Sequence, residues 1–493
     1  MEVPAVPRLA SHDRDRTRAA APPRAGRPGA TLAVTATATA VALMNYTAPL
    51  LTLPDMTAAF GTPASARAWL LNGTPLGLAV LLLVAGGLAD AHGRRRVFLL
   101  GNLALGLFTA LGAFAGGTGT FTAARIAQGA ASAAVLASSL GLLAQAYPEG
   151  RERIRATGIW GASVSVGIAL GPLLAGVLSL ADWRLTYGVL GAAAVATTAL
   201  GARALAREER PEAASVSRPH LEAASAYRPH PQAASARRPR PDLAGAVTFG
   251  LALAALLTAL TLGRDGWLRP RVGLLLLASL ALTALFVVVE HRGRAPMVDP
   301  ALLRRPAFLV STLGALFTGL GAIGLFSVAP ALIQNASGMS ALGAAWLFLL
   351  WSGTAFVVAL QARHLAGRLS AAYQLVLGFV LSAAGTLALL GALDGGPGSW
   401  PRLLPGLFVA GVGSGLLNAA LPRLAVDSVE PERAAMGSGA NNTARYVGSS
   451  SGVAVTMAVA TSGAGPDTAV LVAAALALTG AGITLGLARR PRR

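Results

Sequence analysis

Apolar residues gather in long runs along most of the chain, and short polar segments separate these runs. A helix needs about twenty mostly apolar residues to cross the hydrocarbon core of a bilayer. Fourteen runs reach that length and predict helices at 31–53, 68–89, 97–115, 119–146, 156–178, 183–205, 243–262, 271–289, 307–333, 338–362, 371–393, 400–422, 434–461 and 465–488. The predicted fold class is an all-α integral membrane protein with fourteen transmembrane helices.

Residues 206–242 interrupt the apolar pattern with a near-repeat that reads RPEAASVS, RPHLEAASAY, RPHPQAASAR and RPRPD. Large apolar residues are almost absent from it, so the segment cannot form a packed core. We expect a disordered cytoplasmic linker, with binding of anionic lipid headgroups through its arginines as the alternative. Residues 1–30 lack the apolar core of a cleavable signal peptide and predict a disordered cytoplasmic tail.

The linker divides the predicted helices into two sets. The first set, 31–205, predicts an N-terminal six-helix bundle. Two inserted helices at 243–289 and a cytoplasmic loop at 290–306 follow the linker, and then come a C-terminal six-helix bundle at 307–488 and a basic cytoplasmic tail at 489–493. Two similar halves joined by a linker are typical of transporters whose binding site lies near the bilayer midplane.

Composition supports the membrane interpretation. Only 12% of the residues are charged and the mean hydropathy is +0.60, whereas soluble domains carry about 25% charged residues. The net charge of +19 comes from arginines that cluster between apolar runs, which indicates membrane topology rather than a nucleic-acid partner. Their alternation between loops predicts a multi-pass protein of the cell membrane with both termini cytoplasmic.

Cysteine and histidine usage excludes several kinds of site. The chain has no cysteine, so disulfides, thiolate nucleophiles and cysteine-ligated metals are excluded. Its six histidines fall in predicted tails and loops, so no histidine cluster for a metal is expected inside the membrane. We therefore expect neither a metal nor another cofactor.

The segment GGLADAHGRRR follows the second predicted helix and places an acid, a glycine turn and three arginines in one short loop. It is similar to the signature loop of the major facilitator superfamily, G-x-L-x-D-R-x-G-R-R, with Ala91 in place of the usual arginine. The resemblance implies that the chain has the major facilitator fold and that Asp90, Gly93, Arg94 and Arg95 form a gating loop. The alternative is a basic cytoplasmic loop with no mechanical role.

The predicted helix 119–146 carries a charge in its apolar length. Arg125, Gln128 and Ser132 are spaced by three and seven residues and share one face of this helix. A charge at this depth costs about 2.5–3.5 kcal/mol on insertion scales, so Arg125 should face protein or water. The spacing resembles a superfamily signature, R-x-x-q-G, whose arginine is linked to proton coupling. The alternative is that Arg125 only binds backbone carbonyls of a neighbouring helix.

Small residues recur along the predicted helix 156–178 and permit a close approach by another helix, with a kink or break expected near the proline. The pattern resembles the superfamily's antiporter motif G-x8-G-x3-G-P-x2-G-G, although Ala175 replaces one glycine. The resemblance implies export, whereas tight packing alone is the other interpretation. The residues that carry the motif are Gly158, Gly167, Gly171, Pro172 and Gly176.

Other segments narrow the resemblance to the fourteen-helix drug:proton antiporter (multidrug efflux) family. They include MNYT in the first predicted helix, DWR before the sixth and NNTARYVG in the thirteenth. The family usually has an acid where this chain has Asn45. A polar stripe on an apolar helix predicts cavity lining, and the substrate-cavity candidates are Asn45, Ser132, Asn441, Asn442, Arg445 and Tyr446.

None of the 21 acidic residues falls near the middle of a predicted helix. The candidates for proton coupling are therefore Asp55, Asp90 and the central polar pair Arg125 and Gln128, and proton-driven antiport follows from the resemblance alone. Two intramembrane arginines and no central acid predict a neutral to positive cavity. We therefore expect neutral or anionic amphipathic substrates rather than lipophilic cations.

These observations predict a monomeric transporter that exports small drug-like or antibiotic-like molecules by alternating access, driven by a proton gradient. An uptake carrier for a nutrient or metabolite and a transport-inactive sensor on the same fold remain alternatives. A lipid-modifying enzyme is disfavoured because the acids and histidines are scattered along the chain.

Overall fold

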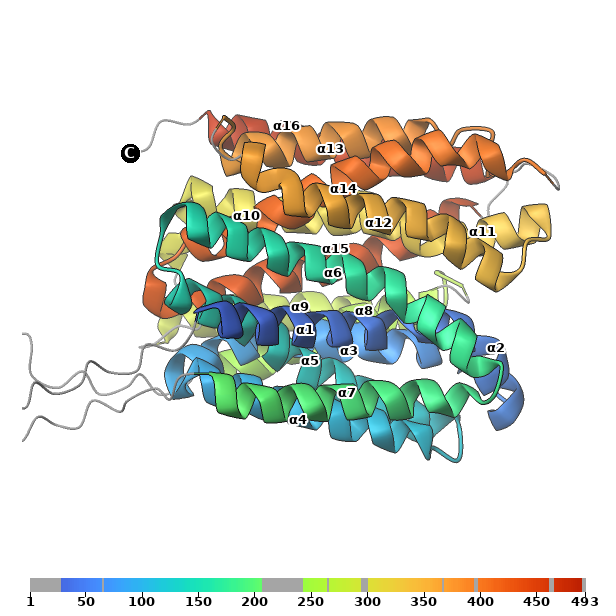
Figure 1. Ribbon diagram of the computed structural model, residues 1–493, viewed down its shortest axis with the longest axis horizontal. Coiled ribbons are helices and arrows are strands. Elements are labelled where there is room, and N and C mark those ends of the chain that lie inside the picture. Colours follow the sequence, from blue (N-terminus) through green and yellow to red (C-terminus); the bar gives the residue numbers. More distant parts are fainter. Residues whose placement is uncertain are drawn as a thin grey trace, which may run out of the picture.

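The computed structural model describes residues 28–63, 66–205, 243–263, 266–293, 300–365, 368–393, 398–460 and 465–489 (Figure 1). The predicted linker lies outside the described residues, as do most of the N-terminal tail, part of the loop 290–306 and most of the C-terminal tail. The described residues form helices and no strands. The all-α class is confirmed.

The N-terminal bundle consists of α1 (Pro28–Thr47), α2 (Pro49–Phe60), α3 (Arg67–His92), α4 (Arg94–Ala113), α5 (Thr118–Ala146), α6 (Gly150–Ser179) and α7 (Trp183–Ala204). The inserted pair is α8 (Leu243–Gly263) and α9 (Pro270–Arg292). The C-terminal bundle consists of α10 (Pro306–Phe317), η3 (Thr318–Ile323), α11 (Gly324–Ser337), α12 (Ala341–Leu365), α13 (Ala371–Leu387), α14 (Leu403–Asp427), α15 (Ala434–Ala460) and α16 (Gly465–Ala488). Short 3-10 turns precede α10, α14 and α15: η2 (Pro300–Arg304), η4 (Trp400–Arg402) and η5 (Pro431–Arg433).

Every predicted span is helical in the structure, and eleven helices of the described chain are long and apolar enough to cross a membrane. Of the other predicted spans, α13 has 17 residues and α15 carries a polar stripe. The first predicted span is divided into α1 and α2, because the helical hydrogen bonding is interrupted at Pro49, while Ala48 keeps a helical backbone conformation. The span at 307–333 contains the π-helical segment η3 between α10 and α11.

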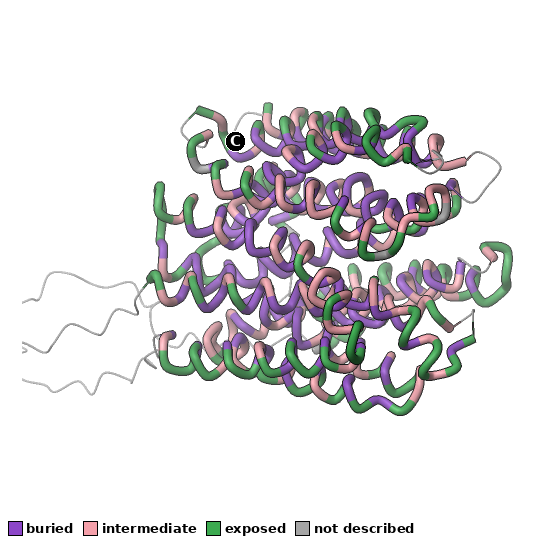
Figure 2. The backbone as a smooth tube through the Cα atoms, turned by 45° about the vertical axis from the view of Figure 1, so that its right-hand side comes forward, coloured by how far each residue is buried: buried purple, intermediate pink, exposed green. Residues whose placement is uncertain are grey.

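Helices of the two bundles pack along a shared interface. α3 and α5 contact α15, while α6 contacts both α12 and α14. Buried residues concentrate on these inner surfaces, and exposed residues lie on the outer faces (Figure 2). Many of the exposed residues are large and apolar, for example Leu274, Leu277 and Leu280 on α9. An apolar outer surface fits a protein surrounded by lipid.

The inserted pair lies at the edge of the interface between the bundles. α8 contacts both α3 and α15, and α9 packs mainly on α8. Asn72 on α3 donates a hydrogen bond to Thr261 on α8 at 3.3 Å. The insert therefore touches both bundles without interrupting the contacts between them.

Candidate functional site

A fully buried arginine lies inside the N-terminal bundle. Arg125 on α5 is 0% exposed. Its Nη1 donates to the backbone oxygen of Asn45 at 2.8 Å, to Asn45 Oδ1 at 2.6 Å and to Gln128 Oε1 at 2.8 Å. Its Nη2 donates to the backbone oxygen of Tyr46 at 3.2 Å. A guanidinium inside a membrane is tolerated when oxygens accept its protons, so these contacts hold Arg125 against the end of α1.

The interruption between α1 and α2 explains why the backbone oxygen of Asn45 accepts a hydrogen bond from Arg125. In a continuous helix the oxygen of Asn45 would accept from the N–H four residues later, but that residue is Pro49, which has no N–H. Arg125 supplies the missing donor. The backbone bonding expected as an alternative for Arg125 is therefore present, and a coupling role for this residue stays a prediction.

Close packing of α3 on α5 positions the guanidinium. A Cβ added at Gly73 would lie 2.7 Å from the Cβ of Arg125, and one at Gly77 would lie 2.1 Å from the backbone oxygen of Ile126. A Cβ at Gly129 would lie 2.2 Å from the backbone oxygen of Thr74. These three glycines allow the two backbones to touch, which brings Arg125 to the level of the α1 break.

The polar network extends from Arg125 to α4. Gln128 Nε2 donates to the backbone oxygen of Phe108 at 2.9 Å, and Asn45 Nδ2 donates to Thr109 Oγ1. Asn45, Gln128 and Arg125 are therefore brought together as the sequence predicted, but their polar groups are occupied within the bundle.

Two other predicted residues do not join this network. Ser132 is buried on α5, and its Oγ has no hydrogen-bond partner. Asp55 is exposed on α2 and makes none of the contacts that hold Arg125. The structure therefore separates Asp55 from the central polar pair.

The predicted polar stripe on α15 divides into two kinds of residue. Asn441 Nδ2 donates to the backbone oxygen and to the Oγ of Ser311 on α10, both at 2.9 Å. Asn442 Nδ2 donates at 3.0 Å to the backbone oxygen of Ser438 in its own helix. These two amides serve packing, whereas Arg445, which is 4% exposed, has a buried Nε without a hydrogen-bond partner.

A pair of tyrosines joins the two bundles near both buried arginines. The rings of Tyr46 on α1 and Tyr446 on α15 have centroids 5.8 Å apart and are tilted by 60°. Tyr46 accepts from Arg125 through its backbone, and Tyr446 follows Arg445 directly in the chain. The interface therefore holds one tyrosine from each bundle, and each tyrosine is linked to a buried arginine of its own bundle.

The predicted gating loop also connects the bundles. Asp90 at the end of α3 accepts from Nε of Arg94 at 2.9 Å, and its two oxygens accept from the backbone N–H groups of Ala435 at 3.3 Å and Met436 at 2.7 Å. Those N–H groups begin α15, where a helix favours negative charge. Asp90 therefore links α3 to α15 of the opposite bundle.

Arg94 strengthens the same connection. Its Nη1 donates to the backbone oxygen of Gly141 on α5 at 3.0 Å, and its Nη2 donates to the backbone oxygens of Pro431 and Glu432 in η5. We call Asp90, Arg94 and their backbone partners the α3–α15 latch. The latch contains the charges predicted for gating, whereas its action as a gate stays a prediction.

The remaining residues of this loop serve the N-terminal bundle. Gly93 has φ 103°, a backbone conformation that favours glycine, and it turns the chain between α3 and α4. Arg95 donates from Nη2 to the backbone oxygen of Ala202 at 2.8 Å and from Nε to that of Leu205 at 3.2 Å. Arg95 therefore satisfies carbonyls at the end of α7 and lies apart from the latch.

Comparison with known protein families shows which family contains these features. The family model described as Major Facilitator Superfamily matches residues 35–453, which includes both buried arginines and the latch. The chain belongs to the major facilitator superfamily.

Several curated members of the superfamily are similar to this chain. It is 30% identical to the multidrug resistance protein Stp of Mycobacterium tuberculosis over 412 aligned residues. This alignment covers 82% of this chain and 70% of that protein. It is 31% identical to the cephamycin export protein CmcT of Amycolatopsis lactamdurans over 462 aligned residues. This alignment covers 88% of this chain and 86% of that protein.

A solved structure of the superfamily has the same fold. The human organic anion transporter MFSD10 aligns with a TM-score of 0.61 over 93% of this chain and 98% of that chain. The sequence identity is 16%, so this likeness shows the fold alone. The predicted major facilitator fold is confirmed, and the chain is a multi-pass membrane transporter of this superfamily.

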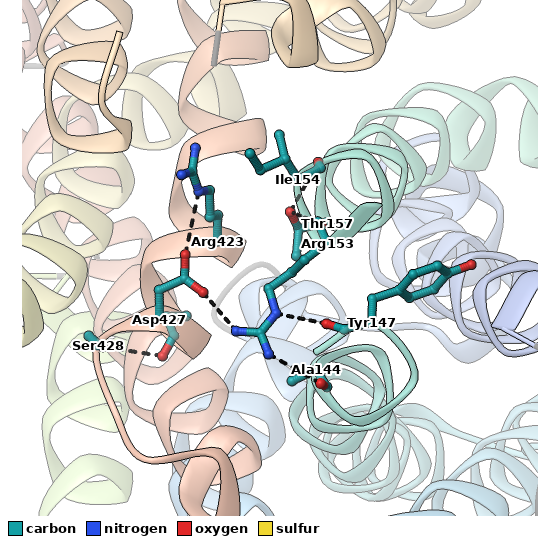
Figure 3. Close-up of polar contacts among 9 residues, drawn as sticks. Ala144, Tyr147, Arg153, Ile154, Thr157, Arg423, Asp427 and Ser428 are labelled. Atoms are coloured by element: carbon teal, nitrogen blue, oxygen red, sulfur yellow. Dashed lines mark hydrogen bonds and ion pairs between the residues drawn. The ribbon is translucent and has the colours of Figure 1, made fainter. Parts of the chain in front are cut away.

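This superfamily member also has an ion pair between the bundles that the sequence analysis did not predict (Figure 3). Arg153 on α6 donates from Nη1 to Oδ1 of Asp427 on α14 at 2.9 Å, and Arg423 approaches the other carboxylate oxygen at 3.4 Å. Arg153 also donates to the backbone oxygens of Tyr147 and Ala144. Arg153 and Asp427 are 274 positions apart, so only the packing of α6 on α14 could identify their pairing.

An exposed ion pair lies within the C-terminal bundle of this transporter. Arg305 donates to Glu430 at 2.8 Å, and this hydrogen bond lowers the pKa of the Glu430 carboxyl below its usual value. Because the pKa is lowered, the pair is fully ionised at neutral pH and is lost only as the pH falls through the lowered value. Any pH dependence of transport near neutrality must therefore come from another group.

The α6 glycines of this transporter face two different neighbours. Cβ atoms added at Gly167 and Gly171 would lie 2.5 Å from the Cβ of Leu43 and 2.1 Å from Oγ1 of Thr47, both on α1 of the same bundle. One added at Gly161, which the predicted motif does not include, would lie 2.0 Å from the backbone oxygen of Asn418 on α14. The closest glycine contact between the bundles therefore comes from outside the motif.

The two ends of the α6 motif touch the C-terminal bundle more loosely. A Cβ at Gly158 would lie 3.3 Å from the backbone oxygen of Ala359 on α12, and one at Gly176 would lie 3.2 Å from a methyl group of Leu342 on α12. α6 continues through Pro172 to Ser179, so the proline does not end the helix. The motif therefore packs mainly on α1 and reaches the other bundle at its ends.

Proposed function

We propose that this transporter exports small amphipathic molecules, of the drug or antibiotic kind, by alternating access. The observation that carries the proposal is the α3–α15 latch, because its polar contacts join the two bundles at one end of their interface and can break and re-form. A buried polar centre lies deeper in the same interface. A closed end and a central site are what rocking of two bundles about a substrate requires.

Two features support export rather than uptake. Curated relatives similar to this chain are named as a multidrug resistance protein and an export protein. The glycine pattern of α6 is similar to the antiporter motif of the superfamily, and Gly167 and Gly171 hold α6 tightly on α1. The substrate of this transporter would enter from the cytoplasm and leave on the opposite side.

The proposed orientation places the latch on the cytoplasmic side of the cell membrane. Arginines gather at this end of the bundles, as expected for the cytoplasmic face. Described members of this group are Arg94, Arg95, Arg96, Arg151, Arg153, Arg155, Arg305 and Arg423. Both termini would then be cytoplasmic, and the transporter would act as a monomer.

Asp90 is the best-placed acid for proton coupling. Its side chain is 11% exposed and holds both Arg94 and the start of α15. Protonation would remove its negative charge and weaken both connections. We propose that a proton taken up by Asp90 favours opening of the cytoplasmic end, which would link proton movement to alternating access.

Inverted membrane vesicles test the direction of transport. Vesicles that contain the full chain should accumulate an amphipathic fluorescent drug when their interior is acidified, and collapse of the pH gradient should stop accumulation. Vesicles without the protein are the control. Accumulation confined to right-side-out vesicles would support the uptake alternative instead, and equal flux with and without the protein would support the transport-inactive sensor.

A further inference from the structure

Arg445 is a buried charge that the fold itself leaves without a counter-ion. It is 4% exposed, its Nε has no hydrogen-bond partner, and the ion pairs between described residues do not include it. The Nε of Arg125 also lacks a hydrogen-bond partner, but four hydrogen bonds from its Nη atoms reach oxygens of α1 and α5. The side chain of Arg445 donates no hydrogen bond to another described residue. An unpaired guanidinium inside a membrane protein loses hydration free energy that a ligand can restore.

Arg445 lies near the middle of the membrane. α5 and α15 run in opposite directions, because Arg94 binds Gly141 near the end of α5 and Pro431 just before α15. Arg445 is eleven residues from the start of α15 at Ala434, which corresponds to about 16 Å along a helix. This is about half the thickness of the hydrocarbon core.

Among the described residues, tyrosines and no carboxylates interact electrostatically with Arg445. Tyr446 and Tyr46 are the titratable side chains that interact electrostatically with it. The acids of the described chain lie in loops, in the terminal turns of helices or, for Asp55, on an exposed face of α2. Asp90 in the latch and Asp427 at the end of α14 are occupied by arginines. A negative partner for Arg445 at this depth must therefore come from outside the described protein.

The backbone beside Arg445 is held close to an irregular helix. A Cβ added at Gly319 in the π-helical η3 would lie 2.2 Å from the backbone oxygen of Arg445. π-helical turns are frequent at functional sites, because they displace one turn of a helix relative to its neighbours. The close packing therefore restrains the backbone of Arg445.

We propose that Arg445 binds the acidic group of the transported molecule, so that the substrates are amphipathic organic anions with a carboxylate, sulfonate or phenolate. The guanidinium can donate two parallel hydrogen bonds to such a group. The rings of Tyr46 and Tyr446 would contact the apolar body of the molecule. This assignment rests on the proposed export function and names the substrate class of the same central site.

Equilibrium binding to the purified full chain tests Arg445 without requiring transport. The protein is placed in nanodiscs of phosphatidylcholine, which carries no net charge and so excludes an anionic lipid headgroup as the partner. Fluorescence anisotropy then measures binding of fluorescein, an aromatic anion, and of ethidium, an aromatic cation. The variants are Arg445→Gln, Arg445→Lys and the matched control Arg489→Gln, which removes an exposed arginine at the end of α16.

The wild type should bind fluorescein saturably and more tightly than ethidium. Arg445→Gln should weaken fluorescein binding about tenfold or more, which is the loss expected for a charge-assisted pair. Arg445→Lys should retain part of the affinity because it keeps the charge, and Arg489→Gln should match the wild type. A stable elution profile for each variant shows that loss of binding is not loss of fold.

Two results would overturn the assignment. One is unchanged fluorescein affinity in Arg445→Gln, and the other is wild-type binding of ethidium that equals or exceeds that of fluorescein. Failure of the export function gives a different pattern, in which Arg445-dependent binding is present but vesicles accumulate neither dye. Repeating the measurement with phosphatidylglycerol nanodiscs separates a substrate anion from a lipid anion, because lipid binding at Arg445 would compete with fluorescein.

Discussion

Arg125 and Arg445 are both buried charges, and they differ in the partners that the protein gives them. The carbonyl left without a donor by Pro49 gives Arg125 a partner within the protein. The side chain of Arg445 donates no hydrogen bond to another described residue and interacts electrostatically with Tyr446 and Tyr46. Burial of a charge is costly in both cases, so Arg125 is suited to hold the fold and Arg445 is suited to hold a ligand.

A double-mutant cycle tests the structural role of Arg125. Arg125→Ala removes the donor to the backbone oxygen of Asn45 and should lower the free energy of unfolding by about 1–3 kcal/mol for this unsatisfied oxygen. In a Pro49→Ala background, residue 49 regains its N–H and can bond Asn45, so the same Arg125→Ala change should cost less. Thermal unfolding of the purified variants measures this. Additive effects of the two changes would contradict the explanation.

Sequence reasoning identified most of the polar residues but not their partners. Arg125, Gln128, Asn45 and Asp90 were identifiable because a charged or amide side chain is conspicuous in or beside an apolar run. Asp55 shares that chemistry, but it lies on an exposed face of α2. The break after α1 had a signal in Pro49, although the apolar run continues across it.

At the element scale, the bundles meet through helix ends as well as through their faces. The latch joins α3 and α4 to η5 and α15, and Arg153 with Asp427 joins α6 to α14. The glycines of α6 show why motif spacing alone could not predict these contacts. Gly167 and Gly171 pack within one bundle, whereas Gly161 packs between bundles, and a shared small size does not reveal which neighbour a glycine faces.

Cysteine labelling tests whether the latch holds the cytoplasmic end closed. The chain has no cysteine, so Ser438→Cys introduces a single thiol at a fully buried position between α15 and α5. Inverted vesicles expose the cytoplasmic end to a membrane-impermeant maleimide, and the rate at which it labels Ser438→Cys is measured. Adding Asp90→Asn removes the charge that binds Arg94. This loss of a charge-assisted contact should raise the labelling rate several-fold. Arg489→Cys, which is exposed, should label equally with and without Asp90→Asn. Equal labelling of Ser438→Cys in both backgrounds would show that Asp90 does not hold the end closed.

For the whole molecule, the requirements of a lipid bilayer made the helical spans predictable from the sequence. Backbone groups in lipid must be satisfied within each helix, so apolar runs predict spans with little ambiguity, and all fourteen predicted spans are helical. The relative placement of helices depends on long-range packing, which is why the contacts of α8 with both bundles were not predictable. Superfamily membership and the arrangement of the bundles together support a transporter that alternates between two accessible states.

Transport by the purified protein in liposomes is the most direct test of that account. A pH gradient is imposed across liposomes that contain the full chain, and proton movement is recorded while fluorescein is added on one side. The account predicts proton flux that depends on the added compound and is largely lost in Asp90→Asn. Compound flux that is unaffected by the gradient would contradict proton coupling, and the absence of any flux of neutral, anionic or cationic amphipathic compounds would contradict the proposed export function itself.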